Sequence, residues 1–146
     1  MSPSVKKLWT WLNKTIAKPN KKIGGHAVCP YITQYMDHIM IVEDTDPEQV
    51  LKNFVNFRSV FKLEAVVVVG MDWDFDTLTD WCEHMCKKYK RKDIEVLGMA
   101  PDSEEPPLPL GYNYHKPIVV IQTRSTLLNA RKLLAKNTDY YDYYNG

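Results

Sequence analysis

The chain has 146 residues and a formal net charge of +1; 45% of its residues are hydrophobic and 25% are charged. These values are typical of one folded globular domain. The near-neutral charge excludes a strong electrostatic field for nucleic acid or an anionic membrane. No apolar run approaches the roughly 20 residues that cross a bilayer, and the interrupted N-terminal segment does not resemble a signal peptide. An odd count of three cysteines favours a reduced, cytoplasmic protein.

The N-terminal segment predicts a helix that begins at Ser2 and Pro3, since serine is a good cap and proline suits the first turn. This helix should end before Pro19, because a proline disfavours helical backbone in the residue before it. Residues 20–25 indicate a loop, and a short helix is expected near Pro30. The apolar positions at helical spacing are Val5, Leu8, Trp9, Leu12 and Ile16.

A buried strand is expected over residues 38–43, followed by a helix start at residues 44–48. That start combines cap residues, an early proline and acidic side chains in the first turn. Residues 65–69 (AVVVV) are β-branched without interruption, which is typical of a strand covered on both faces. The apolar face expected for the intervening helix consists of Val50, Leu51, Phe54, Phe57 and Phe61.

The second half predicts a helix over about 74–90, a strand over 94–97 and a long proline-rich loop over 99–116. Another strand is expected over 117–123. Ser125 is then expected to cap a final helix that ends near Lys136, with Leu127, Ala130 and Leu134 facing inward.

The element order α-β-α-β-α-β-β-α predicts an α/β fold with one domain over 1–138 and a Tyr-rich tail over 139–146. We expect a four-stranded mixed sheet with helices packed on it, in a thioredoxin-like or ferredoxin-like layering. The first two crossovers should place their strands in parallel, and the last strand should pair antiparallel. The Cys-x-x-Cys motif of thioredoxin-like redox proteins is absent, because the matching helix start holds Asp44-Thr45-Asp46-Pro47.

The strongest candidate for chemistry is Cys29, which lies three residues after His26 and directly before Pro30. A thiol at a helix start beside an imidazole has a lowered pKa and becomes a nucleophile. His115 is a candidate helper, so the catalytic prediction is Cys29 with His26 and His115. The alternative interpretation is that Cys29 is a small buried apolar residue before a turn.

Two groups of residues are candidates for metal ligands. Asp72, Asp74 and Asp76 follow a predicted strand and match acidic positions of a calcium loop, but the glycine that such a loop needs is replaced by Thr77. The same acids are explained by the start of a helix. Four other residues of suitable type for zinc have no standard spacing: His26, Cys29, Cys82 and Cys86. No cofactor motif is present, so no cofactor and no metal are predicted.

The long loop and the tail are candidate interaction segments. The loop contains Tyr112, Asn113 and Tyr114, which are predicted as binding residues, and three prolines that stiffen it. The tail either contacts a partner, folds onto its own domain or is disordered. A protein partner is therefore expected through residues 99–116 or the tail, with no nucleic acid, no membrane and no assigned oligomeric state.

Several short motifs along the chain resemble those of a bacterial family of uncharacterised proteins. That family has an N-terminal helix with a tryptophan and a Leu-Cys-Pro-Phe motif. The matching residues here are Trp9 or Trp11, Val28-Cys29-Pro30-Tyr31, Asp46-Pro47, residues 65–69, Asp74-Phe75 and residues 113–117. The resemblance implies a shared architecture over nearly the whole chain, and it implies no activity.

These observations rank three functions. The first is a non-catalytic binding or interaction module. The second is a thiol-dependent enzyme or redox protein that uses Cys29 with His26, so the sequence leaves open whether the protein is an enzyme. The third is a metal-binding protein. A site should show at least two convergent chemical groups, and only His26 with Cys29 approaches that.

Overall fold

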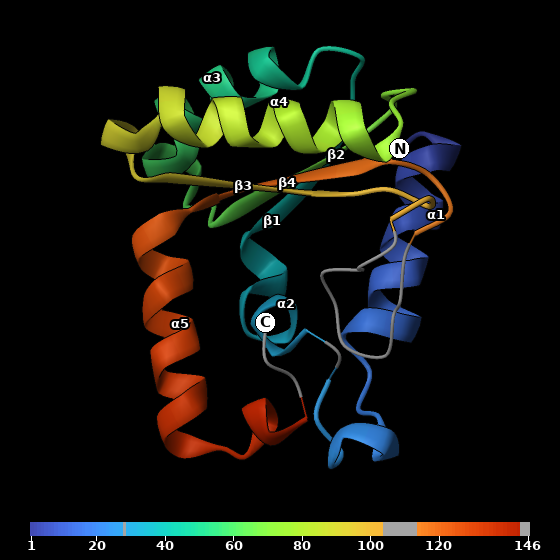
Figure 1. The fold of residues 1–146 in the computed structure, drawn as a ribbon, viewed down its shortest axis with the longest axis vertical. Helices are drawn as coiled ribbons and strands as arrows, with labels where there is room; N and C mark the ends of the chain where they lie inside the picture. The colour runs from blue at the N-terminus through green and yellow to red at the C-terminus, as the bar shows by residue number, and fades with distance from the viewer. Residues whose placement is uncertain (28, 104–113, 144–146) are drawn as a thin grey trace.

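The sheet has four strands in the order β1-β2-β4-β3 (Figure 1). The computed structural model describes residues 1–27, 29–103 and 114–143, except for the side chains of residues 32 and 33. Strand β1 is parallel to β2, and β4 is antiparallel to both β2 and β3. The expected single-domain α/β fold with a four-stranded mixed sheet is confirmed, including the antiparallel last strand. The strands are Ile39–Glu43 (β1), Ala65–Val69 (β2), Ile94–Met99 (β3) and Ile118–Thr123 (β4).

Helices lie on both sides of this sheet (Figure 1). One face is covered by α3 (Pro47–Phe61) and α4 (Phe75–Lys88). The opposite side carries α1 (Pro3–Trp11), α2 (Pro30–Tyr35) and α5 (Arg124–Asn137). A π-helical turn over Leu12–Ile16 extends α1. Within the described residues, no helix has the length and apolar character that crossing a membrane requires.

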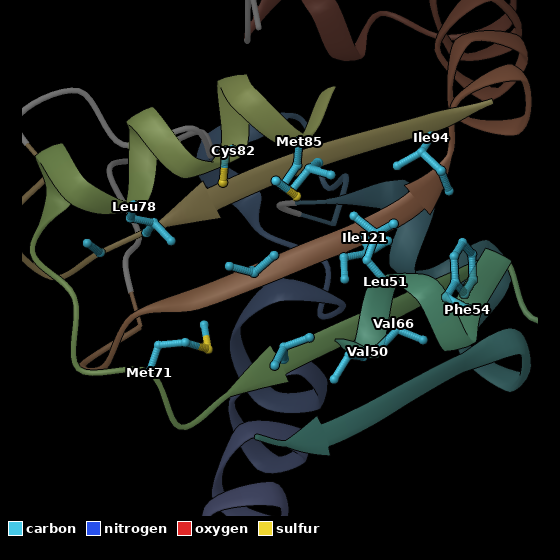
Figure 2. Close-up of a cluster of buried hydrophobic side chains, with 14 residues drawn as sticks. Val50, Leu51, Phe54, Val66, Met71, Leu78, Cys82, Met85, Ile94 and Ile121 are labelled. Carbon is cyan, nitrogen blue, oxygen red and sulfur yellow. The ribbon is translucent and has the colours of Figure 1, made fainter. Parts of the chain in front are cut away.

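Strand β2 is buried on both faces, as its unbroken run of β-branched residues predicts. Val66 and Val68 point toward α3 and α4, whereas Val67 and Val69 point to the other side of the sheet. Their exposed fractions are 3%, 0%, 3% and 1% in that order. Figure 2 shows the first cluster, in which Leu78, Cys82 and Met85 of α4 descend onto the sheet. The sheet therefore separates two apolar cores.

Local capping fixes three helix starts where the sequence predicts them. The side chain of Ser2 accepts a hydrogen bond from the backbone N–H of Val5 at 3.2 Å. Asp46 caps α3, and Asp74 caps α4 by accepting from the N–H of Thr77 at 2.8 Å. Each cap satisfies a backbone donor that the first helical turn leaves without a partner.

The expected cap of α5 is wrong. Ser125 lies inside the helix, and Thr123 at the cap position makes no side-chain cap bond. Instead, the carboxylate of Asp93 accepts from the backbone N–H of Ser125 at 2.9 Å and from its hydroxyl at 2.5 Å. The cap thus comes from a residue 32 positions earlier, which no local pattern reveals.

The apolar face of α3 is also shorter than expected. Val50, Leu51 and Phe54 are buried, but Phe57 and Phe61 are 50% and 64% exposed. The 15 residues of α3 span about 22 Å, whereas a five-residue strand spans about 17 Å. The helix is thus longer than the strands it packs on, and its two exposed rings contact each other at 6.2 Å between centroids.

The two helices on this face are joined at one end by Glu48. Its carboxylate accepts from Lys88 Nζ at 2.6 Å and from the hydroxyl of Tyr89 at 2.9 Å. These bonds, the one from Lys88 first, lower the pKa of Glu48. A lowered folded-state pKa means that the carboxylate stabilises the fold above its unfolded pKa, and that this contribution is lost as pH falls through the folded value.

We therefore predict that Glu48→Gln lowers the melting temperature near neutral pH by about 2 °C, the scale of a partly exposed ion pair. The difference from wild type should shrink as the medium is acidified, because the wild-type carboxyl then becomes neutral as well. Calorimetry across a pH series measures both effects. Glu83→Gln, at an exposed position of α4, is the control and should have no such pH-dependent deficit. A deficit for Glu48→Gln that is unchanged in acid would contradict the prediction.

Candidate functional site

A cavity of about 130 Å³ lies against the face of the sheet opposite α3 and α4. Helix α5 starts at the end of β4 and runs away from the sheet, so it does not cover this face along its length (Figure 1). The floor of the cavity consists of side chains from all four strands. They are Ile39, Ala65, Val67, Leu97, Met99, Ile118 and Val120.

The walls of the cavity come from helices far apart in the sequence. Trp11 and the π-helical residues Leu12 and Ile16 line one wall, and Leu127 and Ala130 of α5 line another. Further aromatic walls come from α2 and from the C-terminal segment. These aromatic residues are Tyr31, Tyr35, Tyr140 and Tyr141. The cavity is thus bounded mainly by apolar and aromatic side chains.

Polar side chains occur at two levels of this cavity. Glu64, Gln122, Thr123 and Thr126 line it close to the sheet. Residue 64 is held there because its backbone carbonyl accepts from the N–H of Thr123. Arg131 lies eight residues after Thr123, which corresponds to about 12 Å along a helix. The carboxylate of Glu64 and the guanidinium of Arg131 therefore line the cavity at different distances from the sheet.

A tyrosine pair connects α2 with the C-terminal segment. The hydroxyl of Tyr31 is hydrogen-bonded to that of Tyr141, across 110 residues of chain. Burial is the main cause that raises the pKa of Tyr31 above its ordinary value, followed by the bond to Tyr141. The positive charge of Arg131 acts in the opposite direction, which indicates that Arg131 lies within electrostatic range of this hydroxyl.

Cys29 lines the same cavity and is partly buried. Its backbone N–H donates to the carbonyl of Ile16 at 3.1 Å, which ties the loop before α2 to the π-helical turn. It occupies the N-cap position of α2, as its place before Pro30 predicts. Sequence reasoning therefore selected a residue that does face a cavity.

The other two cysteines have structural surroundings on the opposite face of the sheet. Burial raises the pKa of the Cys82 thiol to about 12. Burial also raises the pKa of Cys86. The sulfur of Cys86 accepts from the backbone N–H of Val96 at 3.3 Å and donates to its carbonyl at 3.4 Å. Both thiols are thereby kept in the neutral form, which is the unreactive one.

Neither candidate histidine is among the residues that line the cavity beside Cys29. His26 Nε2 lies 2.6 Å from Asp139 Oδ1, and its ring contacts Tyr140 edge-on. His115 lines a second, polar depression of about 780 Å³ at the carboxyl ends of β1 and β2, together with Glu43 and Lys116. Cys29 and His115 therefore line separate cavities.

The predicted acids do not form a metal site. Asp72 and Asp74 line the polar depression, while Asp74 also caps α4. Within the described part of the chain, no group of three or more His, Cys, Asp or Glu side chains is arranged to hold a metal ion. The hypothesis of a zinc site built from His26, Cys29, Cys82 and Cys86 is also wrong. Cys29 and Cys82 lie on opposite faces of the sheet and cannot bind one ion.

The structure describes one of the three predicted binding residues of the long loop, Tyr114. Tyr112 and Asn113 lie outside the described residues. Tyr114 is 3% exposed and packs on Trp11 with 5.2 Å between ring centroids. In the tail, Tyr140 is 1% exposed and belongs to the core between the sheet and α1. The described part of the tail thus packs on the domain.

Sequence reasoning missed the contribution of α5 to the cavity. Leu127, Ala130 and Leu134 were expected to face inward, but Arg131 was not singled out. Residues three and four apart share a helix face, so Arg131 lies beside Leu127 and Leu134 on the inward side. A permanently charged residue within an apolar helix stripe is the sequence feature that could have indicated a functional role for Arg131.

Comparisons with protein-family models, with curated proteins and with solved structures find no match for this chain. The cavity and its charged groups are therefore the basis for the functional inference.

Proposed function

We propose that the protein is a non-catalytic binding module that holds a small apolar molecule in the cavity beneath the sheet. The observation that carries this proposal is a cavity of about 130 Å³ whose floor and walls are mainly aliphatic and aromatic. Binding sites for small molecules are concave and largely apolar, with a few polar groups that orient the ligand. The polar side chains at the two levels of this cavity fit that description.

The cavity volume limits the size of the molecule. An apolar cavity of about 150 Å³ in another protein remains dry and binds benzene. A cavity of about 130 Å³ therefore suits one aromatic ring or a short aliphatic chain. A larger ligand would have to extend past the mouth of the cavity.

Benzamide is a suitable neutral probe of this proposal. We expect a dissociation constant on the order of 1 mM, or about −4 kcal/mol. At about ten times that concentration, the ligand should stabilise the fold by about 1.4 kcal/mol. Nuclear magnetic resonance should show shifts confined to the cavity lining, including Val67, Val120 and Leu127. Shifts spread over the surface, or none at saturating benzamide, would refute the proposal.

Thiol chemistry at Cys29 is a second candidate function. The observation in its favour is that Cys29 lines the cavity, so a bound molecule would lie against the sulfur. The contact between His26 and Asp139 supports a hydrogen-bonded imidazole in the adjoining loop. This candidate and the binding module make the same use of the cavity and differ in whether the bound molecule reacts.

Alkylation with iodoacetamide should distinguish the thiols. We expect the folded protein near pH 8 to be labelled at Cys29 at least about tenfold faster than at Cys82 or Cys86, because only thiolates react and burial disfavours them at the latter two. Mass spectrometry of the labelled peptides measures the three rates. Saturating benzamide should slow the labelling of Cys29, and Cys29→Ser should abolish the fast phase. Equal rates at all three thiols would argue against any special role for Cys29.

The proposal also includes three predictions from the sequence. They are a protein partner at residues 99–116 or 139–146, a cytoplasmic location, and the resemblance to the bacterial family.

A further inference from the structure

Arg131 is the cation on the inward side of α5. It lines the cavity together with Leu127 and Ala130, yet the residue as a whole is exposed. An arginine in such a place lays its apolar stem along the cavity wall and holds its guanidinium near solvent at the mouth. The charged group is thus available to a ligand that enters the cavity.

The guanidinium of Arg131 has no hydrogen-bond or ion-pair partner among the described residues. The other two arginines with described contacts differ in this respect. Arg58 donates to the backbone carbonyl of Lys92 at 2.6 Å, and Arg124 lies 3.6 Å from the carboxylate of Glu95. Arg131 therefore keeps its planar set of donors, which matches a carboxylate in two parallel hydrogen bonds.

The acidic group of the cavity sets the orientation of a ligand. Glu64 lines the cavity at the level of the sheet, beside Gln122 and Thr123, whereas Arg131 lies about 12 Å further along α5. A negative group on a ligand is repelled from Glu64 and attracted to Arg131. Between these two charges the lining is apolar and aromatic, which accommodates a ring or a short chain.

From this arrangement we propose that the ligand is a small apolar carboxylate, with its ring or chain in the cavity and its carboxylate on the guanidinium of Arg131. This inference rests on the proposed function, since it requires that the cavity binds a small molecule. The Tyr31–Tyr141 hydroxyl pair lies in electrostatic range of Arg131 and contributes further polar surface at the same end.

Three probes of equal ring size test the charge preference: benzoate, benzamide and benzylamine. Binding to the full chain is measured by calorimetric titration near pH 7, where benzoate is an anion and benzylamine a cation. We expect benzoate to bind about tenfold more tightly than benzamide, the scale of one charge-assisted contact. Benzylamine should bind no more tightly than benzamide.

Arg131→Gln should remove the preference for benzoate, so that the ratio of the benzamide to the benzoate dissociation constant falls from about ten to about one. The matched control is Lys132→Gln, which removes the same charge from the adjacent exposed position and should keep the preference. Circular dichroism and the melting temperature show whether the variants are folded.

The outcomes separate the two proposals. If none of the probes binds, the cavity proposal itself fails. If benzamide binds as tightly as benzoate, or if Arg131→Gln keeps the preference for benzoate, the carboxylate assignment is overturned while the cavity proposal stands. Tightest binding of benzylamine would likewise overturn it and assign the selection to Glu64.

Discussion

Gly98→Ala is expected to destabilise the protein by about 1–3 kcal/mol, the range of an overpacked core. A Cβ atom at position 98 would lie 2.7 Å from Leu78 Cγ and 2.9 Å from Cys82 Sγ. Both atoms belong to side chains of α4 that are buried against the sheet (Figure 2). The helix therefore approaches β3 as closely as a glycine permits, and an added methyl group must displace it.

The sign of this effect is diagnostic. Replacing glycine by alanine without a clash usually stabilises a protein by about 0.4–1 kcal/mol, since it restricts the unfolded chain. Denaturant unfolding of the variant, compared with wild type, measures the difference. Cys82→Ala removes one of the two opposing atoms, so Gly98→Ala should cost less in that background. A Gly98→Ala variant that is as stable as wild type would show that α4 is not held against β3 by this contact.

Ala130→Leu is expected to weaken benzamide binding at least about tenfold. Ala130 is 4% exposed and lines the cavity from α5. Leucine adds three carbon atoms to a wall of a cavity of about 130 Å³, so the ligand and the new side chain compete for the same space. Leucine is nearly as good a helix former as alanine, so the helix itself should persist. The melting temperature should stay level or rise, because filling a void restores packing contacts.

The matched control for this prediction is Ala135→Leu, an identical change at an exposed position of the same helix. It should leave benzamide binding as in wild type. Ala65→Ile fills the cavity from the floor instead, and it keeps the test decisive if Ala130→Leu fails to fold. Calorimetric titration measures the affinities. Unaltered binding of benzamide by both filled variants would mean that the ligand binds elsewhere.

Local patterns predicted the elements well, because each depends on residues close together in the chain. The proline and the acids at the start of α3 give a cap at Asp46, and the run of β-branched residues gives β2. The same locality explains the errors. Phe57 and Phe61 share a helical stripe with Phe54, but no other element in the described part of the chain buries them in the way that Phe54 is buried. Ser125 has the chemistry of a cap, yet Asp93, the residue before β3, supplies the bonds.

The candidate site was predicted in part. The position of Cys29 before a proline indicated a helix start, and the structure places it both there and in the cavity lining. The placement of Cys29 and His115 in separate cavities could not be predicted from the sequence, because it depends on where the loops that carry them lie relative to the sheet. Helix periodicity could place Arg131 on the inward side of α5. Its position in a cavity wall could not be predicted, since no local pattern shows that a cavity lies beside α5.

By itself, the sequence determined which segments form the helices and strands and where α1, α3 and α4 begin, because capping and periodicity act over a few residues. Only the tertiary structure decided the strand order β1-β2-β4-β3 and the cavity that this order and the departing α5 leave uncovered. The walls of that cavity bring Tyr31 to Tyr141 across 110 residues. Such contacts arise when separate apolar faces pack together, and the free energy of that packing depends on every element at once.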